Sequence, residues 1–216
     1  MEDRLIISYG AAAADPAAPA IVIDRAGGRP LRLADGPYPF PEPPDLFRLA
    51  TTQERLAFLR AHLESLCGLW DKRARLFLDA YFAHIGIVLD AAVPVLAARA
   101  AGLFAPRDWS FAALRPLPQA HLAGAVRVDF AFWTGAALVA VELLGSATQR
   151  RQRQAELARL REDGVAIITL ATSDLQRDGA EVLARTLPAP FHDFWRAVPL
   201  PVSPFVPPLD EIVTAG

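Results

Sequence analysis

Two strand-like segments followed by a helix-like segment constrain the fold more than any other part of the chain. Residues 126–133, VRVDFAFW, alternate large apolar side chains with others, which is the period-two pattern of a β-strand. A short turn at 134–137 leads into 138–144, LVAVELL, a run apolar enough for a strand covered on both faces. An Arg- and Gln-rich stretch, 147–162, then ends before Asp163-Gly164, and a glycine is typical just after a helix. The expected order is strand, strand, helix.

A carboxylate interrupts each of the two strand-like segments, at Asp129 and at Glu142. Ionised carboxylates in apolar strands are costly unless they are paired or bind a metal ion. The turn between the strands brings the two positions roughly opposite each other, and on a shared face their oxygens are placed to bind one hard cation such as Mg²⁺. The spacing equally allows a structural interpretation. In that interpretation Asp129 caps a strand edge or pairs with an arginine, and Glu142 is a solvated edge residue.

Four segments carry a resemblance to a known family: VDFAF, LVAVELLG, LARLREDGVAIITL and DLQRDGAEVLARTL, in this order between about Ala112 and Leu187. They resemble the PD-(D/E)xK nuclease superfamily, and within it the small domains similar to very-short-patch-repair endonucleases. The resemblance implies an α+β fold whose restriction-endonuclease-like core has about four mixed strands flanked by helices. It also implies a nuclease that hydrolyses phosphodiester bonds in DNA, with Mg²⁺ or Mn²⁺ held by Asp129, Glu142 and the backbone carbonyl of Leu143.

Leu144 departs from the family pattern, because it stands where the family carries a lysine, or in some branches an aspartate or asparagine. A cationic or polar side chain must replace that lysine. The nearest candidates on the following helix are Gln149, Arg150 and Arg153, with Gln149 as the candidate that joins the two carboxylates in catalysis. Lys72 is distant in sequence and is a weaker candidate.

Two alternatives to an active nuclease follow from the same residues. The first is a nuclease fold that has lost catalysis and acts as a nucleic-acid-binding or protein-assembly module, because Leu144 leaves the site without its usual cation. The second is an unrelated α+β domain in which Asp129 and Glu142 have structural roles.

The helix-like segment after Glu142 is strongly basic, although the whole chain has a net charge of −2. Such a balance argues against a general polyanion binder, so a nucleic-acid contact requires a local patch. Between residues 149 and 161 the acidic Glu156 is accompanied by Arg150, Arg151, Arg153, Arg159 and Arg161. We expect Arg150, Arg151 and Arg153 to contact phosphates, with DNA as the expected partner and RNA left open. A solvated helix face is the structural alternative.

The chain divides by composition into five parts. We expect an N-terminal β element at 1–35, a Pro-rich linker at 36–50, a helical layer at 51–105, the nuclease-like core at 106–187 and a Pro-rich tail at 188–216. In the helical layer we expect one helix that begins with a capping box at Thr51, a second that begins at Lys72 and a third that Asp90 caps. The tail either packs over the body through Phe191, Phe194 and Trp195 or binds a protein partner.

The expected sheet of the core is mixed. Its strands are Phe111–Ala120, Val126–Trp133, Leu138–Leu144 and Val165–Leu170, and the first three are antiparallel because their connections are short. The fourth returns parallel to the Glu142 strand through a right-handed crossover that contains the basic helix. A closing helix capped by Ser173 or Asp174 follows. In this arrangement the carboxylate oxygens of Asp129 and Glu142 lie roughly 4 to 6 Å apart.

Composition bears on the compartment. The single cysteine, Cys67, excludes an internal disulfide and fits a reducing environment. The N-terminal MEDRLIISYG lacks the pattern of a signal peptide, and charged residues with Pro94 interrupt the apolar run at 86–105, which argues against a membrane span. We expect a cytoplasmic protein with the arginine-for-lysine bias of a GC-rich bacterial genome, and a homodimer is one option for its assembly.

Overall fold

A computed structural model describes residues 4–11, 18–36, 38, 40, 49–68, 71–100, 102–122, 126–144 and 147–205. Most of the expected Pro-rich linker, at 41–48, and the end of the tail, at 206–216, lie outside these ranges. The side chains of residues 147, 149, 150 and 152 also lie outside the description. The expected roles of the Gln149 and Arg150 side chains therefore stay predictions.

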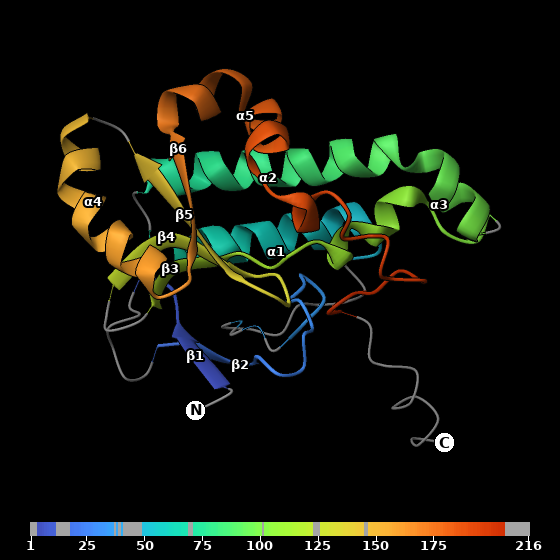
Figure 1. Ribbon diagram of the computed structural model, residues 1–216. Helices are drawn as coiled ribbons and strands as arrows, with labels where there is room; N and C mark the ends of the chain where they lie inside the picture. The colour runs from blue at the N-terminus through green and yellow to red at the C-terminus, as the bar shows by residue number, and fades with distance from the viewer. Residues whose placement is uncertain are drawn as a thin grey trace.

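The described strands form one mixed sheet in the order β2-β1-β3-β4-β5-β6, which makes the fold α+β, as expected (Figure 1). The strands are β1 Arg4–Ser8, β2 Ala20–Asp24, β3 Leu117–Leu122, β4 Val126–Trp133, β5 Leu138–Leu144 and β6 Ala166–Ala171. Neighbouring strands are antiparallel except β5 and β6, which are parallel. The expected order and directions of the four core strands are confirmed. The sheet is larger than expected, because the N-terminal hairpin of β1 and β2 adds two strands at its edge.

The first core strand begins later than the sequence predicted. Residues Pro106–Ala112 form a 3₁₀ helix, η1, and β3 begins only at Leu117, so a strand starting at Phe111 is wrong. The prolines explain part of this difference, since Pro106 favours the first turn of a helix and Pro116 has no N–H for a sheet bond. The Asp108 carboxylate also accepts a hydrogen bond from the Ala105 N–H, which stabilises the start of η1.

The helices are α1 Thr52–Leu66, α2 Lys72–Ala91, α3 Val93–Ala100, α4 Ala147–Glu162 and α5 Thr172–Thr186, with a second 3₁₀ helix, η2, at Ala189–Phe191. The capping box at Thr51 and Glu54 is confirmed. Asp90 does not cap a helix, because α2 continues through it and its carboxylate pairs with Arg107 at 2.5 Å. Ser173 and Asp174 do not cap α5 either, since its N-cap residue is Ala171 and no side chain bonds there.

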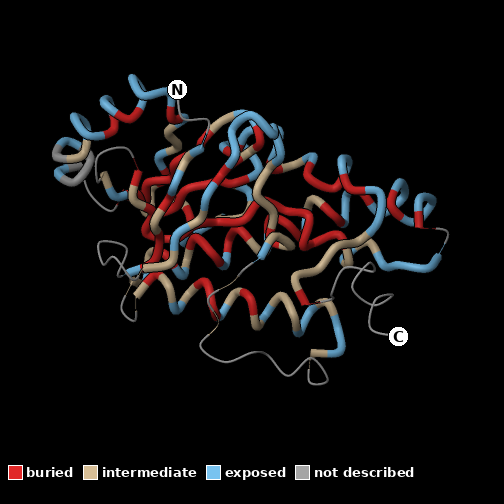
Figure 2. Tube along the Cα trace, turned by 90° about the horizontal axis from the view of Figure 1, so that it is seen from below, coloured by how far each residue is buried: buried red, intermediate tan, exposed pale blue. Residues whose placement is uncertain are grey.

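Two apolar layers enclose the sheet. On one face the aromatic residues Phe130 and Phe132 of β4 pack against Phe77 and Tyr81 of α2, and α1 and α5 extend the same layer. On the other face α4 covers the sheet through Leu157 and Leu160. Figure 2 shows the buried residues concentrated along the strands and on the sides of the helices that face them. The sheet is therefore the middle layer of the molecule.

The first part of the Pro-rich tail packs onto the α2 side of the body. Phe191, Phe194 and Trp195 are buried in the core there, as expected. The carbonyl oxygen of Val198 accepts hydrogen bonds from the Trp109 indole at 3.0 Å and from Arg99 at 3.2 Å. In the described part of the chain no single helix is long and apolar enough to cross a membrane, and the only helix pair that would be, α2 with α3, is bent by 69°.

Candidate active site

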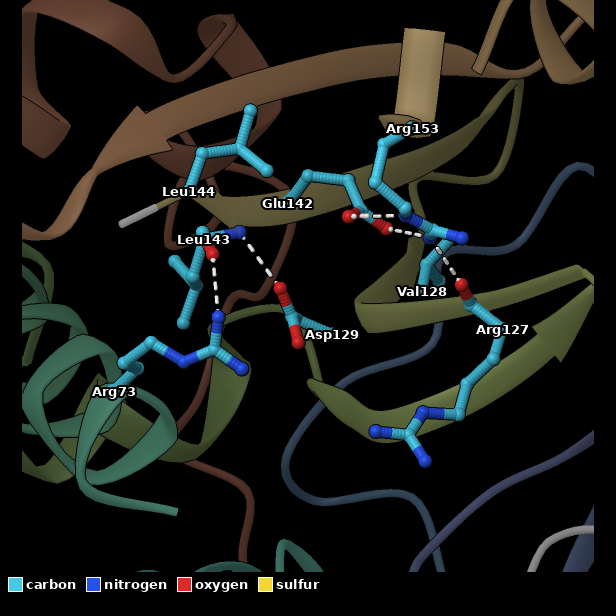
Figure 3. A pocket seen from close by; sticks show the side chains of 8 residues that line it. All are labelled: Arg73, Arg127, Val128, Asp129, Glu142, Leu143, Leu144 and Arg153. Carbon is cyan, nitrogen blue, oxygen red and sulfur yellow. Dashed lines mark hydrogen bonds and ion pairs between the residues drawn. The ribbon is translucent and has the colours of Figure 1, made fainter. Parts of the chain in front are cut away.

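The candidate site begins where β4 and β5 separate. Their paired residues run from Trp133 opposite Leu138 to Phe130 opposite Val141. The next opposing pair would be Asp129 and Glu142, but the ladder stops there. Instead the Asp129 carboxylate oxygen Oδ2 accepts a hydrogen bond from the Leu143 N–H at 2.7 Å. A side chain thus replaces a backbone partner, and β4 and β5 are no longer paired beyond this point (Figure 3).

The β3 and β4 strands kink together at the same place. Gln119 of β3 has a φ of +49°, in the left-handed region that non-glycine residues rarely adopt. The ladder between β3 and β4 runs on both sides of Gln119 and Asp129 but skips this pair. As a result Phe130 packs on the α2 side while Val128 packs on the α4 side. The simple alternation expected across 126–133 is therefore wrong at Asp129.

The divergence of the strands opens a cavity of about 300 Å³. Its walls come from β4, from β5, from the first turn of α2 and from α4 (Figure 3). The lining residues are Arg73, Arg127, Val128, Asp129, Glu142, Leu143, Leu144 and Arg153. Both predicted carboxylates and the predicted carbonyl residue thus lie on one cavity, together with three arginines.

Arg153 is the cation that α4 brings to Glu142. Its Nη2 lies 2.7 Å from Glu142 Oε1 and its Nε lies 3.3 Å from Oε2, so the guanidinium contacts both carboxylate oxygens. Arg153 also donates to the carbonyl oxygen of Arg127 and pairs with Glu156. The sequence places it there because Leu157, four residues later on the same helix face, is buried against the sheet. Arg153 therefore places a positive charge next to Glu142, which the apolar Leu144 cannot do.

Arg73 contacts the carbonyl oxygen of Leu143, the third candidate metal ligand. It lies in the first turn of α2, whose N-cap is Asp71, and its Nη1 donates to the Leu143 carbonyl oxygen at 3.1 Å. The backbone of Leu143 is thus held on both sides of its Cα, by Asp129 at its N–H and by Arg73 at its carbonyl. A carbonyl oxygen has two lone pairs, so one remains for a further partner.

Burial shifts the titration of both carboxylates in the same direction. The pKa of Asp129 is raised, chiefly by desolvation, against the hydrogen bond from Leu143 and the charge of Arg73. The pKa of Glu142 is also raised, again chiefly by desolvation, while Arg153 opposes the shift and the charge of Asp129 adds to it. Perturbed carboxylates of this kind gather at functional sites.

The structure separates the predicted basic residues. Arg153 lines the cavity, whereas Arg151 is exposed on α4 and does not line it. Arg73 and Arg127 line it although the sequence did not single them out. Arg127 lies two positions before Asp129 in the same strand, which was a usable signal. Arg73 is brought in only by the packing of α2, so no local pattern pointed to it.

The donor chemistry of the cavity fits a hard divalent cation. Two carboxylates and a carbonyl are oxygen ligands, and Mg²⁺ is commonly held by one or two carboxylates with water completing its shell. No group of three or more His, Cys, Asp or Glu residues suited to a metal occurs in the described part of the chain. A metal here would therefore depend on the Leu143 carbonyl and on solvent. The expected separation of the carboxylate oxygens stays a prediction.

Comparisons with known proteins add no family: no family model matches the chain, no curated protein matches it, and no solved structure matches it. The functional argument therefore depends on the chemistry of the cavity.

Proposed function

We propose that this protein is a divalent-metal-dependent nuclease that hydrolyses phosphodiester bonds, with DNA as the first substrate to test. The observation that supports the proposal best is the convergence of Asp129, Glu142, the Leu143 carbonyl and Arg153 on one open cavity. Oxygen ligands for a metal and a cation for the phosphate are the two requirements of metal-assisted phosphodiester hydrolysis.

The roles follow from the contacts of each residue. Asp129, Glu142 and the Leu143 carbonyl would hold Mg²⁺ or Mn²⁺, which supplies Lewis-acid polarisation and a more acidic bound water. Asp129 also holds the Leu143 backbone at its N–H while Arg73 holds it at the carbonyl, which limits the positions that the carbonyl can take. Arg153 compensates the buried charge of Glu142, and its guanidinium is suited to a phosphate oxygen because it presents several donors in one plane.

A second candidate function is a nucleic-acid-binding module without catalysis. Arg153 already contacts both oxygens of Glu142, and Arg73 already donates to the Leu143 carbonyl. In this alternative the arginines take the place that a metal has in an active nuclease, and the cavity serves only to bind phosphate. The two functions differ in whether Glu142 is needed for cleavage or only for the placement of Arg153.

The test is cleavage of supercoiled plasmid, linear duplex, single-stranded DNA and RNA with Mg²⁺ or Mn²⁺. Glu142→Gln preserves the side-chain volume and removes the charge, and Glu181→Gln, at an exposed position on α5, is the matched control. We expect metal-dependent cleavage by the wild type and the control, and loss of cleavage by Glu142→Gln. Cleavage that persists in Glu142→Gln, or its absence with every substrate, contradicts the nuclease proposal.

The binding alternative has its own outcome. If no substrate is cut, Asp129→Ala should leave the affinity for oligonucleotides intact, while charge reversal at Arg150 and Arg153 should abolish it. Equal losses in both variants would count against a binding module.

A further inference from the structure

A second depression adjoins the cavity at the start of α2. Its volume is about 520 Å³, and it shares Arg73 and Arg127 with the cavity as lining residues. Lys72, Asp71 and Gln119 complete the part of its wall that carries charge or hydrogen-bonding groups. Arg73 and Arg127 therefore form the boundary between two hollows that follow one another along the surface.

The uncommitted charge in this depression is positive. Lys72 and Arg127 are both exposed, and neither has an ion-pair partner within the part of the chain that the structure describes. Asp71, by contrast, is occupied: its Oδ1 accepts hydrogen bonds from the N–H groups of Arg73 and Ala74, each at 3.1 Å. The arrangement favours an anion over a cation as the ligand.

Two further residues fit the same conclusion. Burial raises the pKa of the Cys67 thiol to about 12, so this lining residue adds no negative charge at neutral pH. Gln119 carries its side chain toward the depression, where its amide lies 3.5 Å from Asp71 Oδ2. Its backbone has the left-handed φ of +49°, and such strained conformations gather at functional sites.

We infer that the depression binds the phosphate next to the one held in the Glu142 cavity. The ligand is then an oligonucleotide strand with at least two consecutive phosphates, which enters over Lys72 and Arg127 and reaches Arg153. This inference rests on the proposed function, because it takes the cavity as the place of the phosphate to be cut. It makes Lys72, the single lysine of the chain, a binding residue despite its distance in sequence from the two carboxylates.

Binding without metal tests this inference separately from cleavage. Fluorescence anisotropy in EDTA with labelled single-stranded DNA, duplex DNA and RNA of equal length would be measured for Lys72→Glu and Arg127→Glu. Arg185→Glu, exposed on α5, is the matched charge reversal away from both hollows. We expect Lys72→Glu and Arg127→Glu each to lose at least about tenfold in affinity for whichever nucleic acid the wild type binds most tightly. The affinity of Arg185→Glu should change little. The salt dependence should also weaken, by roughly 0.7 in the logarithmic slope for each phosphate of a single strand that the variant no longer neutralises.

A short substrate separates the two claims further. A nucleoside phosphodiester with a single phosphate can place that phosphate in the cavity but has no second phosphate for the depression to bind. The ratio of oligonucleotide hydrolysis to diester hydrolysis should therefore fall in Lys72→Glu and stay unchanged in Arg185→Glu. Equal oligonucleotide affinity of Lys72→Glu, Arg127→Glu and Arg185→Glu overturns the inference even if the protein proves to be a nuclease. A loss of oligonucleotide affinity in Lys72→Glu and Arg127→Glu, but not in Arg185→Glu, supports the inference even if no substrate is cut.

Discussion

The Asp129 carboxylate accepts a hydrogen bond from the Leu143 N–H at 2.7 Å, and this contact lies at the end of the β4–β5 ladder and holds the backbone of Leu143, a residue that lines the cavity. A backbone N–H in this setting needs a partner, because a buried donor without one costs about 1–3 kcal/mol. Asp129 therefore has two separable properties. It is an acceptor for Leu143, which an amide can reproduce, and it is a charge for a metal, which an amide cannot.

The first prediction uses this difference. Asp129→Ala should lower the free energy of unfolding by about 1–3 kcal/mol in urea denaturation, because the Leu143 N–H loses its acceptor. Asp129→Asn should be at least as stable as the wild type and should lose Mn²⁺ binding in calorimetric titration. If Asp129→Asn is as unstable as Asp129→Ala, the acceptor role assigned to the carboxylate is wrong.

The second prediction concerns pH. The raised pKa values of Asp129 and Glu142 mean that the folded protein holds protons more tightly than the unfolded chain does. Between the ordinary carboxyl pKa and the raised values, the stability of the metal-free protein should therefore fall as pH rises. Affinity for Mn²⁺ should increase across the same window, because the metal binds the ionised carboxylates. Unfolding titrations with and without Mn²⁺ measure both trends, and the double variant Asp129→Asn/Glu142→Gln should flatten them.

The strand pattern and the two carboxylates could be predicted from the sequence because each is a local signal. Period-two alternation and apolar runs marked β4 and β5, and acids within such runs stand out as costly. The register of an antiparallel pair joined by a short turn then places Asp129 opposite Glu142. These steps need no knowledge of distant residues.

The remaining features depend on contacts far apart in the chain. Ser8 of β1 pairs with His121 of β3, more than a hundred positions later in the chain. The position of the N-terminal hairpin in the sheet could therefore not be predicted from local sequence patterns. Arg73 reaches Leu143 across 70 positions. The change of strand face at Asp129 lies opposite the left-handed Gln119, a residue whose type gives no hint of a positive φ.

The third prediction tests how the β4–β5 turn is held. Gly135 has a φ of +92°, and a Cβ there would lie 2.5 Å from the Gly28 carbonyl oxygen and 3.0 Å from the Pro30 nitrogen. Gly164 has a similar φ of +83° but nothing within 4 Å of a Cβ. Gly164→Ala should cost only the backbone strain, about 1–2 kcal/mol. Gly135→Ala should cost about 1–3 kcal/mol more, because two backbone atoms must move. Equal losses in urea denaturation would contradict the close approach to Gly28.

The fourth prediction concerns the cation that faces Glu142. Arg153→Ala removes the partner of a buried carboxylate and should lower the free energy of unfolding by about 1–2 kcal/mol, a modest figure because Arg153 is partly exposed and screened by solvent. It should also raise the pKa of Glu142 further, since Arg153 now opposes the effect of burial. Arg159→Ala, an exposed arginine of the same helix, controls for the loss of an α4 charge.

Catalysis should separate the charge of Arg153 from its shape. If Arg153 stabilises charge on the phosphate, Arg153→Ala should slow metal-dependent cleavage by roughly a hundredfold. Arg153→Lys should restore part of this rate, because an ammonium keeps the charge but cannot contact both Glu142 oxygens with one planar group. The rates are compared at saturating Mn²⁺, so that a loss of metal affinity is not mistaken for a slower chemical step. An Arg153→Ala variant that cuts DNA as fast as Arg159→Ala would leave the cation next to Glu142 with a structural role alone.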